Sequence, residues 1–435
     1  MTMNSTQSYV RSEMLPEKAP PVTNVGIIGW IRKNLFATWL DAILTLMALY
    51  IAYSVLSFLI PWVFGGFWNA NSLTECRAKI IEVYGESQNR ACWGVIHERF
   101  WQLMYGFYPE YLYWRPNLAL ILLFVGLAPI LFGNLPKKFL LVSVAVPFIA
   151  PWLLWGGSIW VPVTAFLGFV VGYLVHKFVS VAISPLLGLI LGVLAAIIWW
   201  LFLMGPVGDF LQSIIPLAIE SVESRKFGGF MLSILLGITG ITLSFPLGIV
   251  LALGRQSNLI IVKSLCVGFI EFIRGVPLIT LLFVASVLLQ YFLPKGTEFD
   301  IILRVMIMVT IFAAAYMAEV IRGGLAALPK GQYEAADALG LDYWQAQRLI
   351  IMPQALKISI PGIVSTFIGL FKDTTLVSII AMADPIQWVK FIQSDSDWNG
   401  IIWELYGFVA FVFFIFCFSM SRYSMYLERK LQTGH

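Results

Sequence analysis

The feature that most constrains the fold of this chain is a series of ten apolar runs of membrane-spanning length. A helix needs about 20 apolar residues to cross the hydrocarbon core of a bilayer. The runs lie at residues 37–61, 117–135, 139–156, 159–175, 184–204, 229–253, 265–293, 301–325, 354–372 and 403–426. Only 12% of the residues are charged, roughly half the share of a soluble domain. The sequence therefore predicts an all-α integral membrane protein with about ten transmembrane helices.

Lysine and arginine residues in the short connections predict the orientation of these spans, because short cytoplasmic loops are enriched in both. With ten spans, all of these residues fall on one side, together with both termini. They are Arg11, Lys18, Arg32, Lys33, Lys137, Lys138, Lys177, Arg255, Lys263, Lys330, Arg348, Arg422, Arg429 and Lys430. We therefore expect both termini in the cytoplasm.

The chain divides into two halves of different character. A polar, Pro-rich tail (1–36) is expected to be disordered and cytoplasmic, and it precedes an accessory transmembrane region (37–204) with few intramembrane charges. A linker or amphipathic segment on the outer side (205–228) leads to the second half (229–430), which carries nearly all of the polar irregularity. No sequence repeat relates the halves.

The long loop 62–116 is expected to face the outside and holds two cysteines, Cys76 and Cys92. In an oxidising compartment they can form a disulfide that closes a loop of about 15 residues. Two free thiols are the alternative.

Two charge pairs recur at helical spacing in the second half. Glu271 and Arg274 precede Gly275 and Pro277, which should break or kink the helix. Glu319 and Arg322 repeat the spacing near the end of the eighth run. Residues three apart share a helix face, so each pair can form an ion pair, and the two pairs can also meet between helices. A snorkelling pair at a helix end and a role in a solute pathway both remain open.

A third polar group follows the ninth run. It consists of Lys372, Asp373, Thr374 and Thr375. Charges and hydroxyls at a helix break suit a transporter, because the break frees backbone groups and helix dipole ends for a polar solute. An outer helix end with a solvated Lys–Asp pair is the alternative.

The loop 327–353 is a polar, helix-prone segment between two apolar runs. Less polar residues recur along it at three- and four-residue spacing, which is typical of an amphipathic helix. Gly340 interrupts the pattern, so we expect two short helices joined near Gly340, the second ending at Pro353. Small side chains in the first helix favour close contact with a partner.

This loop resembles the EAA loop of bacterial ABC-importer permeases, in which EAA, three residues, G, nine residues and I-x-L-P follow one another. The matching residues are Glu334-Ala335-Ala336, Gly340 and Ile350-Ile351-Met352-Pro353, with Met352 where leucine is usual. Three further segments resemble polar amino-acid permeases: Phe272–Pro277 (E-x-x-R-G-T-P, with Val276 for Thr), Ala318–Gly324 (A-E-I-x-R-G-G) and Lys372–Leu376 (K-D-T-S-L). The extra front half resembles the long general L-amino-acid and glutamate/glutamine/aspartate/asparagine permeases in length and layout.

The resemblance implies a five-helix type I importer core in the second half, in the inner membrane of a bacterium. It implies a second permease subunit, most simply a heterodimeric partner, two copies of an ATPase and a periplasmic amino-acid-binding protein. Coupling to the ATPase would use Glu334, Ala335, Ala336, Ala338, Leu339, Gly340 and Pro353. Candidate pathway residues are Arg274, Glu271, Lys372, Asp373, Thr374 and Thr375.

Several functions lack support in the sequence. It contains no phosphate-binding loop, no nucleophile motif and only three scattered histidines. We therefore expect no catalytic residues, no metal site and no cofactor on this chain, with ATP and Mg²⁺ on the partner ATPase, and no nucleic-acid partner. An ion-coupled secondary amino-acid transporter acting alone is the main alternative, and a channel or ligand receptor is a third. A secondary transporter would favour an internal repeat and a mid-span acidic residue.

Overall fold

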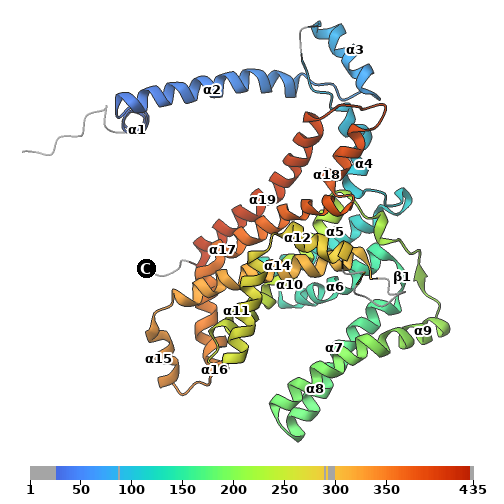
Figure 1. Cartoon of the computed structure of the whole chain (residues 1–435), viewed down its shortest axis with the longest axis vertical. Helices are drawn as coiled ribbons and strands as arrows, with labels where there is room; N and C mark the ends of the chain where they lie inside the picture. Colours follow the sequence, from blue (N-terminus) through green and yellow to red (C-terminus); the bar gives the residue numbers. More distant parts are fainter. Residues whose placement is uncertain (1–25, 87–88, 289–290, 292–298, 432–435) are drawn as a thin grey trace, which may run out of the picture. The chain divides into compact units, whose positions relative to one another are not determined.

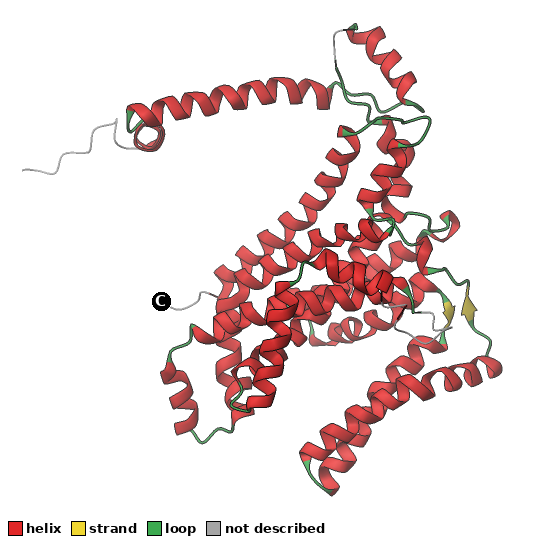
Figure 2. Ribbon diagram, viewed as in Figure 1, coloured by secondary structure: helices red, strands yellow, loops and turns green. Residues whose placement is uncertain are grey.

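The computed structural model describes residues 26–86, 89–288, 291 and 299–431, and nearly all of them are helical (Figure 2). The chain forms two compact units, Met1–Ala70 with Glu75–Trp93 and Asn71–Thr74 with Gly94–His435. Each is described by itself.

The first unit contains a helix that buries none of its residues. Helix α2 (Trp39–Phe64) begins at a capping box, in which the Thr38 hydroxyl accepts from the Asp41 amide and the Asp41 carboxylate accepts from Thr38. It is apolar on all faces, as expected for a helix surrounded by lipid. Most of the predicted disordered tail lies outside the described residues. Its last part is helical instead: α1 (Gly26–Leu35) repeats apolar side chains every four residues, at Ile27, Ile31 and Leu35.

The C-terminal end of α2 is joined to a small disulfide-bonded segment that includes most of α3 (Leu73–Tyr84). Cys76 and Cys92, the pair that the sequence singles out, are bridged. The Trp93 indole N–H donates to the Val63 carbonyl at 2.8 Å, and its ring packs against that of Trp62. Part of the predicted outer loop is therefore ordered around these aromatic side chains.

The second unit holds the remaining helices and one short β-ribbon. The helices are α4 (Gly94–Tyr105), α5 (Trp114–Leu131), α6 (Leu140–Trp155), α7 (Trp160–Ala182), α8 (Pro185–Ile198), α9 (Met204–Ile214), α10 (Gly229–Gln256), α11 (Ile260–Gly275), α12 (Leu278–Phe283), α14 (Ile301–Ala326), α15 (Lys330–Ala338), α16 (Tyr343–Ala346), α17 (Met352–Asp373), α18 (Pro385–Gln393) and α19 (Trp403–Leu431) (Figure 1). Strands β1 (Gly157–Ser158) and β2 (Ala218–Ile219) pair antiparallel. Short 3₁₀ segments are η2 (Glu110–Leu112), η3 (Lys137–Phe139), η5 (Ser224–Lys226) and η8 (Thr374–Ile380), and π-helical turns are η4 (Trp199–Leu203), η6 (Val284–Leu288) and η7 (Gln347–Ile351).

Nine helices within the described ranges are long and apolar enough to cross a membrane. They correspond to nine of the ten predicted spans, with boundaries that differ by up to about a dozen residues. The predicted seventh span, 265–293, is not one helix. It is a bent pair, Ile260–Gly275 and Leu278–Leu288, whose axes meet at 98°. The bend falls at Val276-Pro277, where proline lacks the N–H that would continue the helix.

The bent pair makes one membrane crossing, because α10 and α14 run in the same direction. Gly240 lies against Val309, and Gly248 lies against Met317, so the residue numbers rise together along both helices. The chain must therefore return across the membrane between the end of α10 and the start of α14. The prediction of ten transmembrane spans is confirmed when the bent pair counts as one.

Helices α7 and α8 form a tight hairpin through two GxxxG sequences. Gly172 and Gly192 face each other so closely that a Cβ at Gly192 would lie 2.7 Å from the Gly172 carbonyl oxygen. Small residues allow such close approach of helices in lipid. Across the hairpin, the indole N–H groups of Trp199 and Trp200 donate to the carbonyls of Thr164 and Ala165. Both tryptophans lie in the π-helical turn η4, which joins α8 to α9. The helical run therefore extends from Pro185 to Ile214 and includes the start of the segment 205–228 that was predicted as a linker.

The largest buried cluster of the second unit draws on both sides of the predicted boundary between accessory region and core. It includes Tyr108 and Leu154 from the first half and Leu236 and Val305 from the second. Helix α4 also carries Arg99, which forms an ion pair of 2.8 Å with Asp395, in the connection between α18 and α19. The division of the chain into an accessory region and a permease domain stays a prediction from the sequence, because this cluster contains residues of both.

Candidate functional site: a coupling loop and a charged cluster

The loop between α14 and α17 contains two helical segments joined at a glycine. Helix α15 ends in a Schellman motif: the Leu341 amide donates to the Ala336 carbonyl at 3.2 Å, and the Gly340 amide donates to Asp337 at 2.9 Å. Gly340 has a φ of +70°, a left-handed conformation that glycine adopts without the steric cost of a Cβ. Helix α16 then begins at a capping box formed by Asp342 and Gln345. The bend predicted near Gly340 is confirmed, because the Schellman motif requires a left-handed residue at this position.

The second helical segment does not end at Pro353, contrary to the prediction. Helix α16 continues through η7 into α17, and Tyr343–Ile380 forms one helical run. The π-helical turn immediately precedes Pro353, and the Met352 amide donates to Gln347, five residues earlier. Pro353 follows this turn directly, and the altered hydrogen bonding just before it accommodates a residue that has no N–H within the helical run. The loop is thus continuous with the following span.

The predicted coupling residues present a mostly exposed surface. Glu334, Ala335, Ala338, Leu339 and Gly340 are exposed, whereas Ala336 is 1% exposed. Ala336 anchors α15, and burial raises the pKa of Tyr333, three residues earlier, above its ordinary value. Leu339 and Trp344 are 72% and 70% exposed.

Both ends of this loop are joined to helices that pack closely on each other. The Ser359 hydroxyl of α17 donates to the Val320 carbonyl of α14 at 3.3 Å. A Cβ at Gly324 would meet Ser359 Oγ and lie 2.5 Å from the Ala355 carbonyl oxygen, and one at Gly362 would lie 2.7 Å from Val320. We call this contact the small-residue seam of Gly324, Ser359 and Gly362. It holds α14 and α17 in one antiparallel pair.

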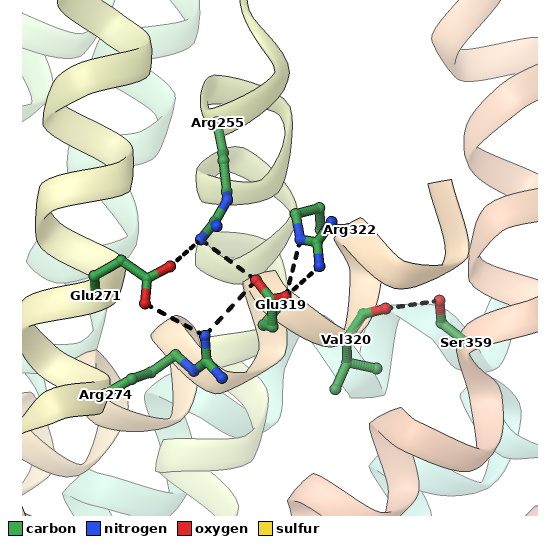
Figure 3. Close-up of polar contacts among 7 residues, drawn as sticks. All are labelled: Arg255, Glu271, Arg274, Glu319, Val320, Arg322 and Ser359. Carbon is green, nitrogen blue, oxygen red and sulfur yellow. Dashed lines mark hydrogen bonds and ion pairs between the residues drawn. The ribbon is translucent and has the colours of Figure 1, made fainter. Parts of the chain in front are cut away.

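The opposite side of α14 carries the charged cluster, which we define as Arg255, Glu271, Arg274, Glu319 and Arg322. These side chains face one another from the ends of α10, α11 and α14 (Figure 3). Both sequence-predicted pairs are present: Arg322 Nε lies 2.9 Å from Glu319 Oε1, and Arg274 Nη1 lies 3.7 Å from Glu271 Oε2. The two pairs also meet, because Arg274 Nη1 lies 3.8 Å from Glu319 Oε2.

Arg255 completes the charged cluster and was not among the predicted site residues. Its Nη1 lies 2.7 Å from Glu271 Oε1 and 3.4 Å from Glu319 Oε2. In the sequence, Arg255 is one of many basic residues at the end of an apolar run, and its position there indicates only the orientation of the span. A pattern within one helix cannot show that α10 ends beside α11 and α14.

The charged cluster has an excess of one positive charge and is only partly shielded from solvent. Side-chain exposures run from 22% for Arg255 to 51% for Glu271. Ion pairs this exposed contribute about 0–1 kcal/mol each. The Arg274 guanidinium also lies over the Tyr316 ring, 5.6 Å from its centroid. The cluster therefore joins three helix ends. Because each ion pair is weak, breaking one pair and forming another changes the free energy little.

The Lys372–Thr375 group lies where the helical run changes from α-helical to 3₁₀ geometry. Helix α17 ends at Asp373 and continues as the 3₁₀ segment η8. The hydroxyls of Thr374 and Thr375 donate to the carbonyls of Phe371 and Lys372, at 2.7 and 2.8 Å, so they satisfy groups that this change of geometry releases. Segment η8 packs against α12, the second half of the bent pair. Within the described residues, no hydrogen bond or ion pair joins this group to the charged cluster.

Comparison with known proteins identifies relatives along the whole chain. Residues 244–433 match the family described as binding-protein-dependent transport system inner membrane component. The chain is 57% identical to the glutamate/glutamine/aspartate/asparagine transport system permease protein BztC of Rhodobacter capsulatus, over 99% of this chain and 100% of that protein. It is 42% identical to the inner membrane amino-acid ABC transporter permease protein YhdY of Escherichia coli, over 93% of each. The probable glutamine ABC transporter permease protein GlnP of Bacillus subtilis is 33% identical over 46% of this chain and 90% of its own length.

Proposed function

Because this chain belongs to the family of binding-protein-dependent transport system inner membrane components, we propose that it is the long permease subunit of an ATP-driven amino-acid importer. The observation that carries the coupling role is the loop 327–353, with its exposed surface around Leu339 and its glycine-terminated helix. It is a short, well-capped helix on a closely packed pair of spans. Such a helix can pass on a displacement from a partner without stretching.

The partner that this loop fits is a separate ATPase in the cytoplasm. Glu334, Ala335 and Ala338 lie on the exposed part of α15, and Leu339 extends from its end. When the ATPase moves, α15 pulls on α14 directly and on α17 through α16 and η7. The small-residue seam makes these two spans respond together.

A second permease subunit completes the pathway in this proposal, and a periplasmic binding protein delivers the solute. Two ATPase copies would serve the two permeases. The proposed sister subunit is a shorter permease of the size of GlnP, which matches about half of this chain, and the pair would then be a heterodimer.

The proposed orientation places both termini and the loop 327–353 in the cytoplasm. The basic residues of the short connections support it. So does the Cys76–Cys92 bridge, because disulfides persist in the periplasm and are rare in the cytoplasm.

The proposed substrates are acidic amino acids and their amides, the class that the name of the Rhodobacter capsulatus relative gives. The proposed pathway passes the helix break at Val276-Pro277 and the change of helical geometry at Asp373-Thr374. Lys372 and Asp373 could meet the charged groups of such a solute there, since the two threonine hydroxyls already donate to the backbone.

Transport by coupling-loop variants tests the proposal. Glu334→Lys and Gly340→Asp should each abolish ATP-dependent uptake of radiolabelled L-glutamate, while the chain still inserts and ATPase activity loses its response to the binding protein. Gly133→Asp is the matched control, because Gly133 lies in an exposed connection with open space around it. Uptake that survives both coupling-loop changes, or that proceeds without any ATPase, would favour the ion-coupled secondary transporter and contradict the proposal.

A further inference from the structure

Helix α11 is attached to its neighbours differently from the other helices around the coupling loop. Helices α10 and α14 pack closely, with a Cβ at Gly248 predicted to lie 2.7 Å from Met317 Cβ. Helix α11 buries only Ile270 and Ile273, while Phe272 is exposed. Its remaining attachment near the bend is the charged cluster. The end of the first half of the broken span is therefore held by the buried side chains of Ile270 and Ile273 together with the ion pairs of the charged cluster.

The distances within the charged cluster are graded. The pairs Arg255–Glu271 and Arg322–Glu319 are tight, with contacts of 2.7 and 2.9 Å. The contacts that reach Glu319 from outside α14 are longer, at 3.4 Å from Arg255 and 3.8 Å from Arg274. The looser contacts are those that join α14 to the other two helices. A displacement of the end of α14 would act first on these contacts.

Arg255 occupies the central position. It is the second-last residue of α10, and it contacts one carboxylate on α11 and one on α14. Arg274 contacts the same two carboxylates at longer distances. A planar guanidinium with five donors can hold two carboxylates at once, which a lysine does less well.

We propose that Arg255 is a positioning residue for transport, which holds Glu271 and Glu319 together so that the bend at Val276-Pro277 follows the movement of the coupling loop. This role rests on the proposed function. Movement of α15 reaches Glu319 through α14, passes through Arg255 and Arg274 to Glu271, and displaces the end of α11. Helix α12 follows the bend and packs against η8, so the displacement arrives at the junction of α17 and η8.

The test measures ATP hydrolysed per amino acid imported. The complex of this chain with its co-purifying subunits is placed in proteoliposomes, with the binding protein and radiolabelled L-glutamate. Arg255→Gln should raise the ratio roughly fivefold, the factor expected for losing two partly exposed ion pairs, because hydrolysis continues while the pathway responds poorly. Arg255→Lys keeps the charge but holds two carboxylates less well, so it should restore the coupling only in part. Glu271→Gln should raise the ratio as Arg255→Gln does, and the double variant should add little further, because the two residues act through one contact.

The control is Lys263→Gln, which removes a charge from an exposed position of α11, the helix that also carries Glu271. It should leave the ratio of ATP to amino acid unchanged. A ratio that stays at the wild-type value in Arg255→Gln and Glu271→Gln would overturn the role of Arg255, as would equal losses of hydrolysis and uptake. If Arg255→Gln does not assemble, Glu271→Gln carries the test, since its side chain is half exposed. A wild-type complex that imports nothing with ATP would overturn the proposed function as well, so the two failures are distinguishable.

Discussion

The two sides of α14 are joined to their neighbours by opposite means. Toward α17, the small-residue seam brings backbone against backbone, with Gly324 and Gly362 leaving no room for side chains. Toward the end of α11, the charged cluster joins long flexible side chains over 2.7 to 3.8 Å, whereas α10 itself packs closely on α14. Figure 3 shows both, with Ser359 on one side of the helix and the arginines on the other.

This difference separates parts that move together from parts that can move relative to one another. Close packing has essentially one good arrangement, because a shift of a fraction of an ångström removes many contacts or creates clashes. Charged side chains can exchange partners at a small cost. The helices that bear the coupling loop thus form one body, while the contact with the bend in α11 can be remade.

The largest expected effect comes from filling the small-residue seam. Gly324→Ala should lower stability by about 1–3 kcal/mol, because the new methyl group overlaps the Ala355 carbonyl and the helices must separate. Thermal denaturation of the purified complex, followed by tryptophan fluorescence, measures this. Gly323→Ala is the control: nothing lies within 4 Å of its Cβ position, so the higher helix propensity of alanine should be neutral or stabilising. Equal effects of the two substitutions would remove the seam from the comparison.

A medium effect is expected from neutralising the acid that the charged cluster shares. Glu319→Gln removes the charge that three arginines contact and should lower stability by about 1 kcal/mol. The ratio of ATP hydrolysed to amino acid imported should rise clearly, although the complex loses little stability. Thermal denaturation and the transport assay on the same preparation measure the two effects. A loss of stability comparable with that of Gly324→Ala would mean that the cluster is as rigid as the seam.

A smaller effect is expected from the single hydrogen bond across the small-residue seam. Ser359→Ala removes the donor to the Val320 carbonyl but keeps the volume nearly unchanged. Since the bond is long at 3.3 Å, the cost should be about 0.5 kcal/mol. The ratio of ATP to amino acid should not change, because shape and not this bond holds the seam. An altered ratio would show that the seam also takes part in coupling.

The smallest effect is expected from salt. Raising ionic strength from about 0.1 to 1 M shortens the Debye length from about 10 to 3 Å. Wild-type complex should then consume slightly more ATP per imported amino acid, by less than about twofold, because exposed members of the charged cluster are screened. Arg255→Gln should show a weaker response, because only the contacts of Arg274 and Arg322 then remain to be screened. The stability difference between Gly324→Ala and Gly323→Ala should be independent of salt, and a strong dependence would argue against close packing as its cause.

The residues that the sequence identified and those it missed differ in the range of their contacts. Gly340 was expected at a bend, and Glu319 and Arg322 were expected to pair, because these effects act within one or two helical turns. Pro353 was expected to end a helix, but η7 adjusts the hydrogen bonding just before it. Arg255 was missed as a site residue because its partners are 16 and 64 positions away in the chain.

The helical membrane class, the ten spans and the position of the polar loop 327–353 could be predicted from the sequence, because span length, composition and helix-terminating residues are local properties. Which helix ends meet could be learned only from the folded arrangement of the helices. That depends on the parallel course of α10 and α14 and on the 98° bend between α11 and α12, which bring Arg255, Glu271 and Glu319 to one point. No periodicity within a single helix carries this information, since it arises from how side chains of different helices fit together.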